Sequence, residues 1–223
     1  MGTLYIVATP IGNLKDITLR AIEVLSSVDL VVCEDTRVTG QLLKHLDISK
    51  KMVAVNDFNE VQRTGEIILN LKLGKNIALV SDAGTPLVSD PGYKIVREAI
   101  SQKITVESIP GPTAAIAALT VSGMPSDKFM FVGYLAKKDG KRKNQVEELK
   151  RISAILKTTF IVYESPFRVI KSLNTIRSVF GDINIVLCRE LTKLHEEIRR
   201  EKLSESIEYF EKTSPKGEFV LLF

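Results

Sequence analysis

The sequence comprises 223 residues, of which 44% are hydrophobic and 26% charged, with a formal net charge of +4. This length supports one large or two small domains with hydrophobic cores, and the composition excludes an intrinsically disordered chain. The mild positive charge permits a nucleic-acid partner without requiring one.

The two cysteines, Cys33 and Cys188, lie far apart, each at the end of an apolar run. This separation gives neither the spacing of a metal site nor a disulfide framework, so we expect buried, reduced thiols in a cytosolic protein. The chain starts directly into a strand pattern without a basic leader. Since no apolar run approaches ~18 residues, these features argue against secretion and against a membrane span.

In the first half of the chain, apolar runs of strand length alternate with helical patterns. This alternation predicts a parallel sheet with helices on both faces. The expected helices over 16–25 and 60–73 each place apolar residues on one face. The expected strands are Leu4–Ala8, Leu30–Cys33, Met52–Val55, Ile77–Val80 and Ile104–Ile109.

A small apolar helix over Thr113–Val121 precedes a cluster of helix-breaking residues, Ser122–Asp127, which we interpret as a domain boundary. A second series of strands follows it. We therefore predict an α/β protein with two α/β domains, residues 1–124 and 125–223. The second series comprises Phe129–Leu135, Thr159–Tyr163, Ile183–Leu187 and Phe219–Phe223.

The loop Ser81–Pro86 follows a buried strand and contains only small or turn-forming residues apart from Asp82. Loops at the carboxyl ends of parallel strands bind the ligands of open α/β sheets, and Gly84 lets the backbone approach a ligand closely. No lysine or further glycine is spaced for a Walker loop or a dinucleotide fingerprint. We expect a small-molecule site here, followed by a helix with Asp90 as N-cap and Pro91 at its first position.

Three loops end a strand and begin a helix with proline at or near its first turn: Ser89–Pro91, Pro110–Thr113 and Glu164–Pro166. Proline at this place stabilises any helix start, so a single such loop carries little functional meaning. Three of them favour a shared site, because helix N-termini offer N–H groups and positive dipole ends to a ligand.

Glu34 and Asp35 follow the second strand, where a carboxylate binds the ribose in nucleotide-binding Rossmann domains. The first loop lacks the glycine triplet that this comparison requires. A helix N-cap paired with Arg37 explains the acidic pair equally well.

Eight motifs occur in order along nearly the whole chain: ATPIGNLKDITLRA, VVCEDTR, VSDAGTPLVSDPG, SIPGPTAAIAAL, FVGYL, VYESPFR, CRELTK and GEFVLLF. In this combination the sequence resembles the small-subunit ribosomal RNA ribose 2′-O-methyltransferase branch of the tetrapyrrole methylase superfamily. The resemblance implies a class III methyltransferase with S-adenosylmethionine folded tightly in a cleft between two α/β domains. It also implies a homodimer that methylates a cytidine in the decoding region of 16S rRNA.

The resemblance also assigns the cofactor contacts to particular positions. They come from the first loop, the loop at residues 81–88, the start of the helix after Pro112, and one tyrosine of the second domain. These residues are Pro10, Asp82, Ala83, Gly84, Thr85, Val88, Thr113, Ala114 and Tyr163.

The chain departs from this family at positions where members often carry histidine, namely Val38, the segment 56–59 and Phe167. A histidine general base at these points is therefore excluded. We expect the two histidines that are present, His45 and His195, to lie on the surface. The additional C-terminal domain of some members is not part of this sequence, so we expect the two α/β domains to supply the RNA affinity.

Methyl transfer from a sulfonium requires an oriented nucleophile, and orientation supplies roughly 7 to 11 kcal/mol in favourable cases. No metal is needed. A ribose hydroxyl is a weak acid, so a carboxylate or a neutral lysine must accept its proton. The candidate proton acceptors are the strand-end carboxylates Glu34, Asp35, Glu164 and Glu190, among which the sequence does not choose.

The strongest basic segment, Lys137–Lys143, follows the FVGYL motif. Taken alone it is a solvated loop and helix start, but for an rRNA enzyme Lys141, Arg142 and Lys143 become candidate phosphate contacts. Arg37, Arg168 and Arg189 each follow a motif carboxylate and are candidate contacts near the target nucleotide. No aromatic-rich platform for single strands is evident.

We therefore predict a cytoplasmic rRNA 2′-O-methyltransferase that acts on small-subunit rRNA or a ribosomal particle. Two alternatives remain. A tetrapyrrole C-methylase would share the cofactor loop but take a large anionic macrocycle. A noncatalytic RNA-binding assembly factor would keep the fold without binding the cofactor.

Overall fold

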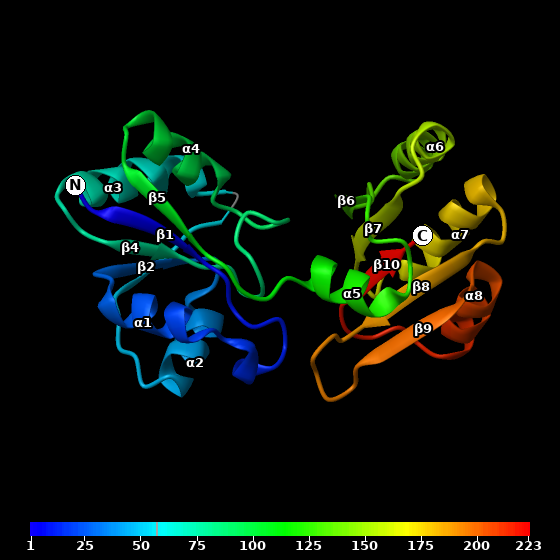
Figure 1. Ribbon diagram of the computed structural model, residues 1–223, viewed down its shortest axis with the longest axis horizontal. Helices are drawn as coiled ribbons and strands as arrows, with labels where there is room; N and C mark the ends of the chain where they lie inside the picture. Colours follow the sequence, from blue (N-terminus) through cyan, green and yellow to red (C-terminus); the bar gives the residue numbers. More distant parts are fainter. Residues whose placement is uncertain (57) are drawn as a thin grey trace. The chain divides into compact units, whose positions relative to one another are not determined.

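The computed structural model describes residues 1–56 and 58–223 and divides into two units, Met1–Thr113 and Ala114–Phe223, each with its own core (Figure 1). Asp57, part of the segment where family members carry histidine, lies outside the described residues. Within the described part of the chain, none of the helices has both the length and the apolar character needed to cross a bilayer.

The first unit contains a five-stranded parallel sheet in the order β3-β2-β4-β1-β5. Its strands match the expected ones to within one or two residues at each end. They are β1 (Thr3–Val7), β2 (Leu30–Cys33), β3 (Met52–Ala54), β4 (Ile77–Leu79) and β5 (Thr105–Ile109). The helices are α1 (Leu19–Ser27), α2 (Thr36–His45), α3 (Glu60–Lys72) and α4 (Tyr93–Ser101), with a short 3₁₀ turn η1 (Leu14–Asp16).

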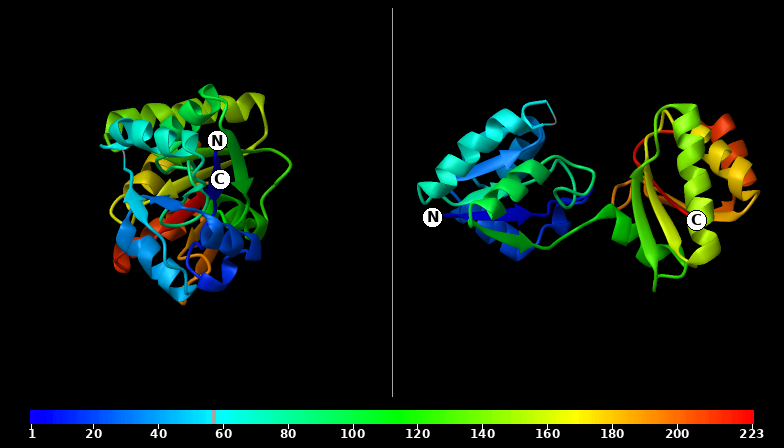
Figure 2. Two further views of the ribbon diagram at one scale, coloured as in Figure 1. Left: turned by 90° about the vertical axis from the view of Figure 1, so that its left-hand side faces the viewer. Right: turned by 90° about the horizontal axis from the view of Figure 1, so that it is seen from above.

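Helices cover both faces of this sheet, with α1 and α2 on one face and α3 and α4 on the other (Figures 1 and 2). The two sides of each strand contribute to separate cores. Ile77 and Leu79 of β4 pack with the α3 and α4 residues, whereas Ala78 packs with those of α1 and α2. The sheet is thus buried on both faces, which explains why its strands read as continuous apolar runs.

Helix α4 begins two residues later than the sequence predicted. Gly92 is its N-cap, and the carboxylate of Glu60 from α3 accepts hydrogen bonds from the N–H groups of Gly92 and Lys94 at 3.0 and 2.9 Å. The expected N-cap, Asp90, lies before the helix. A carboxylate distant in the sequence therefore takes the place of the local cap, and the local prediction was wrong.

The second unit contains a mixed sheet in the order β6-β7-β10-β8-β9. Strands β6 and β7 are parallel, whereas β10 lies antiparallel between β7 and β8. The strands are β6 (Phe129–Tyr134), β7 (Thr159–Glu164), β8 (Asn184–Arg189), β9 (Glu197–Lys202) and β10 (Phe219–Leu222). Helices α6 (Asp139–Ile155), α7 (Val169–Phe180) and α8 (Leu203–Lys212) gather on one face of this sheet (Figure 2).

Helix α5 (Ala114–Ser122) packs on β7 and β10 and belongs to the second unit. Arg200 of β9 fixes its C-terminal end, because the guanidinium donates hydrogen bonds to the carbonyls of Val121 and Ser122. The division of the chain consequently falls after Thr113, whereas the sequence placed it after residue 124. The breaker cluster is a turn within the second unit.

Candidate active site

Hydrogen bonds join the loops that follow β1, β4 and β5 at one edge of the first sheet. Thr9 and Gly84 exchange backbone hydrogen bonds of 2.9 and 3.1 Å, which form an isolated bridge between the first two loops. The Thr85 hydroxyl donates to the Pro112 carbonyl at 3.0 Å, which joins the second loop to the third. The structure thus brings together the first-unit residues that the resemblance assigned to the cofactor.

Gly84 adopts a left-handed conformation with φ of 82°, and a Cβ atom there would lie 3.2 Å from Ile11 Cγ2. A side chain at this position is therefore both strained and crowded. A Cβ on Gly111 in the third loop would meet the Ala8 Cβ at 3.0 Å. The glycines therefore allow the backbones of these loops to pack closely against their neighbours.

Asp82 ties the loop at residues 81–86 to the end of β2. Its carboxylate Oδ1 accepts a hydrogen bond from the backbone N–H of Asp35 at 3.0 Å. Burial of the carboxyl raises the pKa of Asp82, against the lowering effect of that hydrogen bond. The acidic pair at residues 34 and 35 therefore lies directly beside the loop at residues 81–86.

Asp35 is the N-cap of α2. Its carboxylate accepts the backbone N–H of Arg37 at 2.8 Å and pairs with the Arg37 guanidinium at 2.5 Å. These hydrogen bonds lower the pKa of Asp35 to about 2. The sequence left two interpretations of the acidic pair open, a ribose-binding carboxylate and a helix N-cap paired with Arg37. The structure shows that Asp35 is the helix N-cap.

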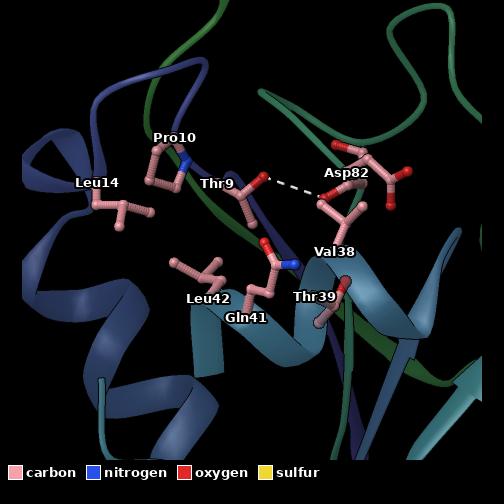
Figure 3. Close-up of a pocket in the computed structure, with 9 residues that line it drawn as sticks. Thr9, Pro10, Leu14, Val38, Thr39, Gln41, Leu42 and Asp82 are labelled. Atoms are coloured by element: carbon pink, nitrogen blue, oxygen red, sulfur yellow. Dashed lines mark hydrogen bonds between the residues drawn. The ribbon is translucent and has the colours of Figure 1, made fainter. Parts of the chain in front are cut away.

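A pocket of about 160 Å³ opens beside these loops (Figure 3). Thr9, Ser81 and Asp82 contribute from the ends of β1 and β4, and Pro10 and Leu14 come from the first loop and η1. The remaining lining residues lie on successive turns of α2: Val38, Thr39, Gln41 and Leu42. The sequence analysis missed this use of α2, although the i, i+3, i+4 spacing of these four positions indicates a single helix face.

In the second unit, the motif VYESPFR has mainly structural contacts. The Glu164 carboxylate is buried and accepts hydrogen bonds from the Ser165 N–H at 2.8 Å and the Ser172 hydroxyl at 2.5 Å, and it pairs with Arg168 at 2.7 Å. Arg168 also donates to the Leu135 carbonyl and lies over the Tyr134 ring. This network joins β6, β7 and α7 and occupies both Glu164 oxygens.

Tyr163 lies on the same strand, and its hydroxyl accepts the backbone N–H of Ala115 at 3.1 Å. Since Ala115 lies in the first turn of α5, this bond fixes the start of the helix that carries Ala114. Both second-unit residues of the expected cofactor set therefore lie at the N-terminal end of α5.

Glu190 is held against the start of β10. Its carboxylate pairs with Lys193 at 2.9 Å and accepts the Glu218 N–H at 2.9 Å. Burial works in the opposite direction, but these hydrogen bonds lower the pKa of Glu190. A Cβ on Gly217 would lie 2.5 Å from this carboxyl, so the absence of a side chain there makes room for it.

The expected RNA contacts differ in accessibility. Lys141 and Lys143 are exposed on α6, and Arg37 is exposed on α2. Arg142 is buried, and its guanidinium donates to Thr175, to the carbonyls at 136 and 137, and to Asp139. We therefore remove Arg142 from the RNA-contact set, because its donors hold α6 against α7.

Arg189, at the end of β8, pairs with Glu197 of β9 at 3.1 Å, and its Nε is buried without a hydrogen-bond partner in the described residues. Both histidines, His45 and His195, are exposed, as expected. Cys33 and Cys188 are buried and free, as also expected.

Comparison with known proteins identifies the family. The sequence matches the tetrapyrrole (corrin/porphyrin) methylase family over residues 3–206. A ribosomal RNA small subunit methyltransferase I from Thermotoga maritima is 44% identical over 222 residues, covering 100% of this chain and 98% of that protein. One of the same name from Vibrio cholerae is 48% identical, covering 98% and 76%. The chain belongs to the ribosomal RNA small subunit methyltransferase I family.

Solved structures confirm the tetrapyrrole methylase fold expected from the motifs. Diphthine synthase superposes with a TM-score of 0.75 at 14% identity, covering 99% of this chain and 89% of that one. The methyltransferase CobJ superposes with a TM-score of 0.73 at 16% identity, covering 100% and 94%. At these identities the likeness concerns the fold alone, whereas the family assignment rests on the ribosomal RNA methyltransferase relatives.

The residues at the loop edge suit the S-adenosylmethionine of this methyltransferase family. The left-handed Gly84 and the closely packed Gly111 allow the loops to come together at this edge. The Asp82 carboxylate and the Thr85 and Thr113 hydroxyls supply polar groups of the kind that an amino acid and a nucleoside require.

Proposed function

We propose that this protein is a cytoplasmic enzyme that transfers the methyl group of S-adenosylmethionine to the ribose 2′-hydroxyl of a cytidine in the decoding region of small-subunit (16S) rRNA. One observation carries the proposal, namely 44 to 48% identity over 222 residues to relatives named ribosomal RNA small subunit methyltransferase I. The three joined loops of the first unit support it by offering a site for the methyl donor.

The residues proposed to hold the cofactor are Pro10, Asp82, Ala83, Gly84, Thr85, Val88, Thr113, Ala114 and Tyr163. The bound cofactor supplies a methyl group on a positively charged sulfur. The loops contribute by fixing the orientation of the ligand and excluding water from it, and such orientation supplies roughly 7 to 11 kcal/mol in favourable cases. The hydrogen bonds of Thr9 and Thr85 keep the loops in place before the ligand arrives.

Glu34 is the proposed acceptor of the ribose proton. The carboxylates of Glu164 and Glu190 each have an ion-pair partner and accept a backbone N–H, and these contacts hold them in structural roles. Glu34 is half-buried at the carboxyl end of β2, and the next peptide N–H is bound by Asp82 of the cofactor loop. The Glu34→Gln variant should lower kcat by roughly 10²- to 10⁴-fold without changing cofactor affinity. Single-turnover methylation and calorimetry check both values, and an unchanged kcat would eliminate Glu34.

Exposed cations contribute the RNA affinity in this proposal. Lys141 and Lys143 on α6 and Arg37 on α2 contact phosphates, which bind protein with little base selectivity. Arg168 and Arg189 contribute indirectly by holding neighbouring segments in place. Arg168 binds the Leu135 carbonyl after β6, and Arg189 pairs with Glu197 of β9.

We also propose that the active form is a homodimer. Helix α5 is almost entirely apolar, and its Ile116 and Val121 remain exposed. Analytical ultracentrifugation of the full chain measures this directly, and a monomer at micromolar concentration would overturn it.

The decisive experiment offers the purified protein labelled cofactor with two kinds of acceptor. Small ribosomal subunits from cells that lack this protein should accept one methyl group per particle, and mapping should place it on a cytidine ribose of the decoding region. Transfer only to a precorrin-like tetrapyrrole would identify a C-methylase instead. A protein that binds RNA but no cofactor at high concentration would be a noncatalytic assembly factor.

A further inference from the structure

The pocket between the first loop and α2 is not accounted for by the residues assigned to the cofactor. Only two of its lining residues, Pro10 and Asp82, belong to that set. Its volume is about 160 Å³. A cavity of roughly 150 Å³ accommodates one six-membered aromatic ring, as benzene binding to engineered protein cavities demonstrates.

The chemistry of the lining suits a flat, polar-edged ring. Pro10, Leu14, Val38 and Leu42 present aliphatic surface, and no lysine or arginine lines the pocket. The amide of Gln41 is directed toward Thr9 and the first loop in Figure 3. A phosphate or a carboxylate would find no cation here, whereas a neutral heterocycle finds apolar walls and an amide.

We propose that this pocket receives the pyrimidine base of the nucleotide that is methylated, after that nucleotide has been turned out of its RNA helix. The aliphatic side chains contact the faces of the ring, and the Gln41 amide bonds its Watson–Crick edge. The inference rests on the proposed function, because it identifies the substrate group at the same edge of the first sheet. Enzymes that modify a nucleotide within a duplex commonly extrude it into such a pocket.

The pocket favours a ligand of limited size. Its volume of about 160 Å³ matches one pyrimidine ring, so a purine would leave its second ring outside the pocket. The Gln41 amide presents one donor and one acceptor side by side, which matches N3 and the N4 amino group of cytosine. A reversed amide would match uracil, and adenine presents the same acceptor and donor pair as cytosine, so Gln41 orients the bound ring while the size of the pocket distinguishes pyrimidines from purines.

Two variants and a matched control test the pocket in the full-length protein. Gln41→Leu keeps the shape of the side chain but loses both hydrogen bonds, and it should lower kcat/KM for small ribosomal subunits about 10- to 100-fold. Val38→Phe should lower it further by filling the pocket. Gln62→Leu changes an exposed glutamine on α3 and should leave kcat/KM unchanged. Calorimetry should give the wild-type affinity for S-adenosylmethionine in all three.

The outcomes separate this inference from the proposed function. Wild-type kcat/KM in both pocket variants would overturn it, and a weakened cofactor affinity would assign the pocket to the cofactor instead. If the wild-type protein methylates no rRNA, the proposed function fails, and the pocket is then tested by binding alone. In that case cytidine 5′-monophosphate at millimolar concentration should shift the methyl NMR signals of Val38 and Leu42, and adenosine 5′-monophosphate should not. Equal shifts, or none, would overturn the inference.

Discussion

At the scale of single residues, the motif carboxylates differ in how far along the chain their partners lie. Glu164 pairs with Arg168 and accepts a hydrogen bond from Ser172, and the Glu190 carboxylate fits against Gly217. The sequence singled out both residues because they follow strands. Their ion-pair partners Arg168 and Lys193 lie within the same motifs, whereas Ser172 and Gly217 come from other elements. For Asp35 the partner Arg37 is two residues away, and the cap was visible in the sequence.

The conformation of Gly84 predicts how its substitution affects cofactor binding. Gly84→Ala introduces a Cβ at φ of 82°, 3.2 Å from Ile11. Gly74→Ala is the matched control, because its φ is 90° and no atom lies within 4 Å of the added carbon. Both variants should lose about 1 to 2 kcal/mol of unfolding free energy in urea titrations. Only Gly84→Ala should also weaken S-adenosylmethionine binding, by at least about tenfold as measured by calorimetry. Equal cofactor affinities in the two variants would contradict the assigned site.

Cys188 predicts a loss of stability at alkaline pH. Burial raises the pKa of its thiol from 9.0 to about 12. The unfolded chain therefore loses this proton at a lower pH than the folded protein, so the contribution is complete below pH 9 and falls between pH 9 and 12. The difference in unfolding free energy between wild type and Cys188→Ala should shrink by about 1.4 kcal/mol per pH unit in this window. A difference independent of pH would show that burial does not raise the pKa of the Cys188 thiol.

At the scale of elements, the apolar elements were predicted well and the charged ones poorly. Strands β1, β2 and β4 are buried on both faces, so their apolar runs identified them. Strand β9 was missed because its sequence, EIRREK, contains a single apolar residue. Its charges pair along the edge of the sheet, and Arg199 lies between Glu197, Glu201 and the Tyr209 ring. Such pairing depends on neighbours brought together by folding and leaves no periodic signal.

The pocket illustrates the same limit. Its α2 residues Val38, Thr39, Gln41 and Leu42 form one helix face, but the sequence shows neither the opposite wall nor the empty space. The loops that join β1, β4 and β5 were predictable because each follows an apolar strand. The cavity depends on the path of η1, whose three residues carry no strong local signal.

Helix α6 carries a structural cation, Arg142, between the two proposed RNA-binding cations Lys141 and Lys143. Arg142→Ala removes donors to Thr175 and Asp139 and should lower the unfolding free energy by about 1 to 3 kcal/mol, with the salt dependence of RNA binding unchanged. The double variant Lys141→Ala and Lys143→Ala should keep its stability. Its plot of log affinity against log salt concentration should flatten by about 1.4 to 1.8. Identical salt slopes for wild type and the double variant would assign Lys141 and Lys143 to a solvated face.

At the scale of the whole molecule, the sequence predicted two α/β domains correctly but placed α5 with the first of them. A helix followed by a breaker cluster resembles the end of a domain. The structure shows that α5 packs on β7 and β10 and is fixed by Arg200, which follows it by 78 residues. The mixed topology of the second sheet was not predicted either, because the antiparallel β10 reads as an ordinary apolar strand.

The position of the division predicts which fragments fold. Residues 114–223 retain α5 over the face of β7 and β10 and should unfold cooperatively in denaturant with a native-like circular dichroism spectrum. Residues 125–223 lack this helix and leave apolar sheet surface exposed, so they should aggregate or unfold without cooperativity. Equal stability of the two fragments would place the boundary after residue 124 instead.

The insertion of β10 between β7 and β8 also determines the order in which the protein is completed during its synthesis. All strands of the first sheet are present once residue 109 has been translated, whereas the second sheet cannot close until residues 219–222 have followed. Domains fold as units, with the N-terminal one first. The growing chain therefore carries a finished first unit while β7 and β8 still await the strand that separates them, and their unpaired edges remain available to chaperones until translation has passed Phe219.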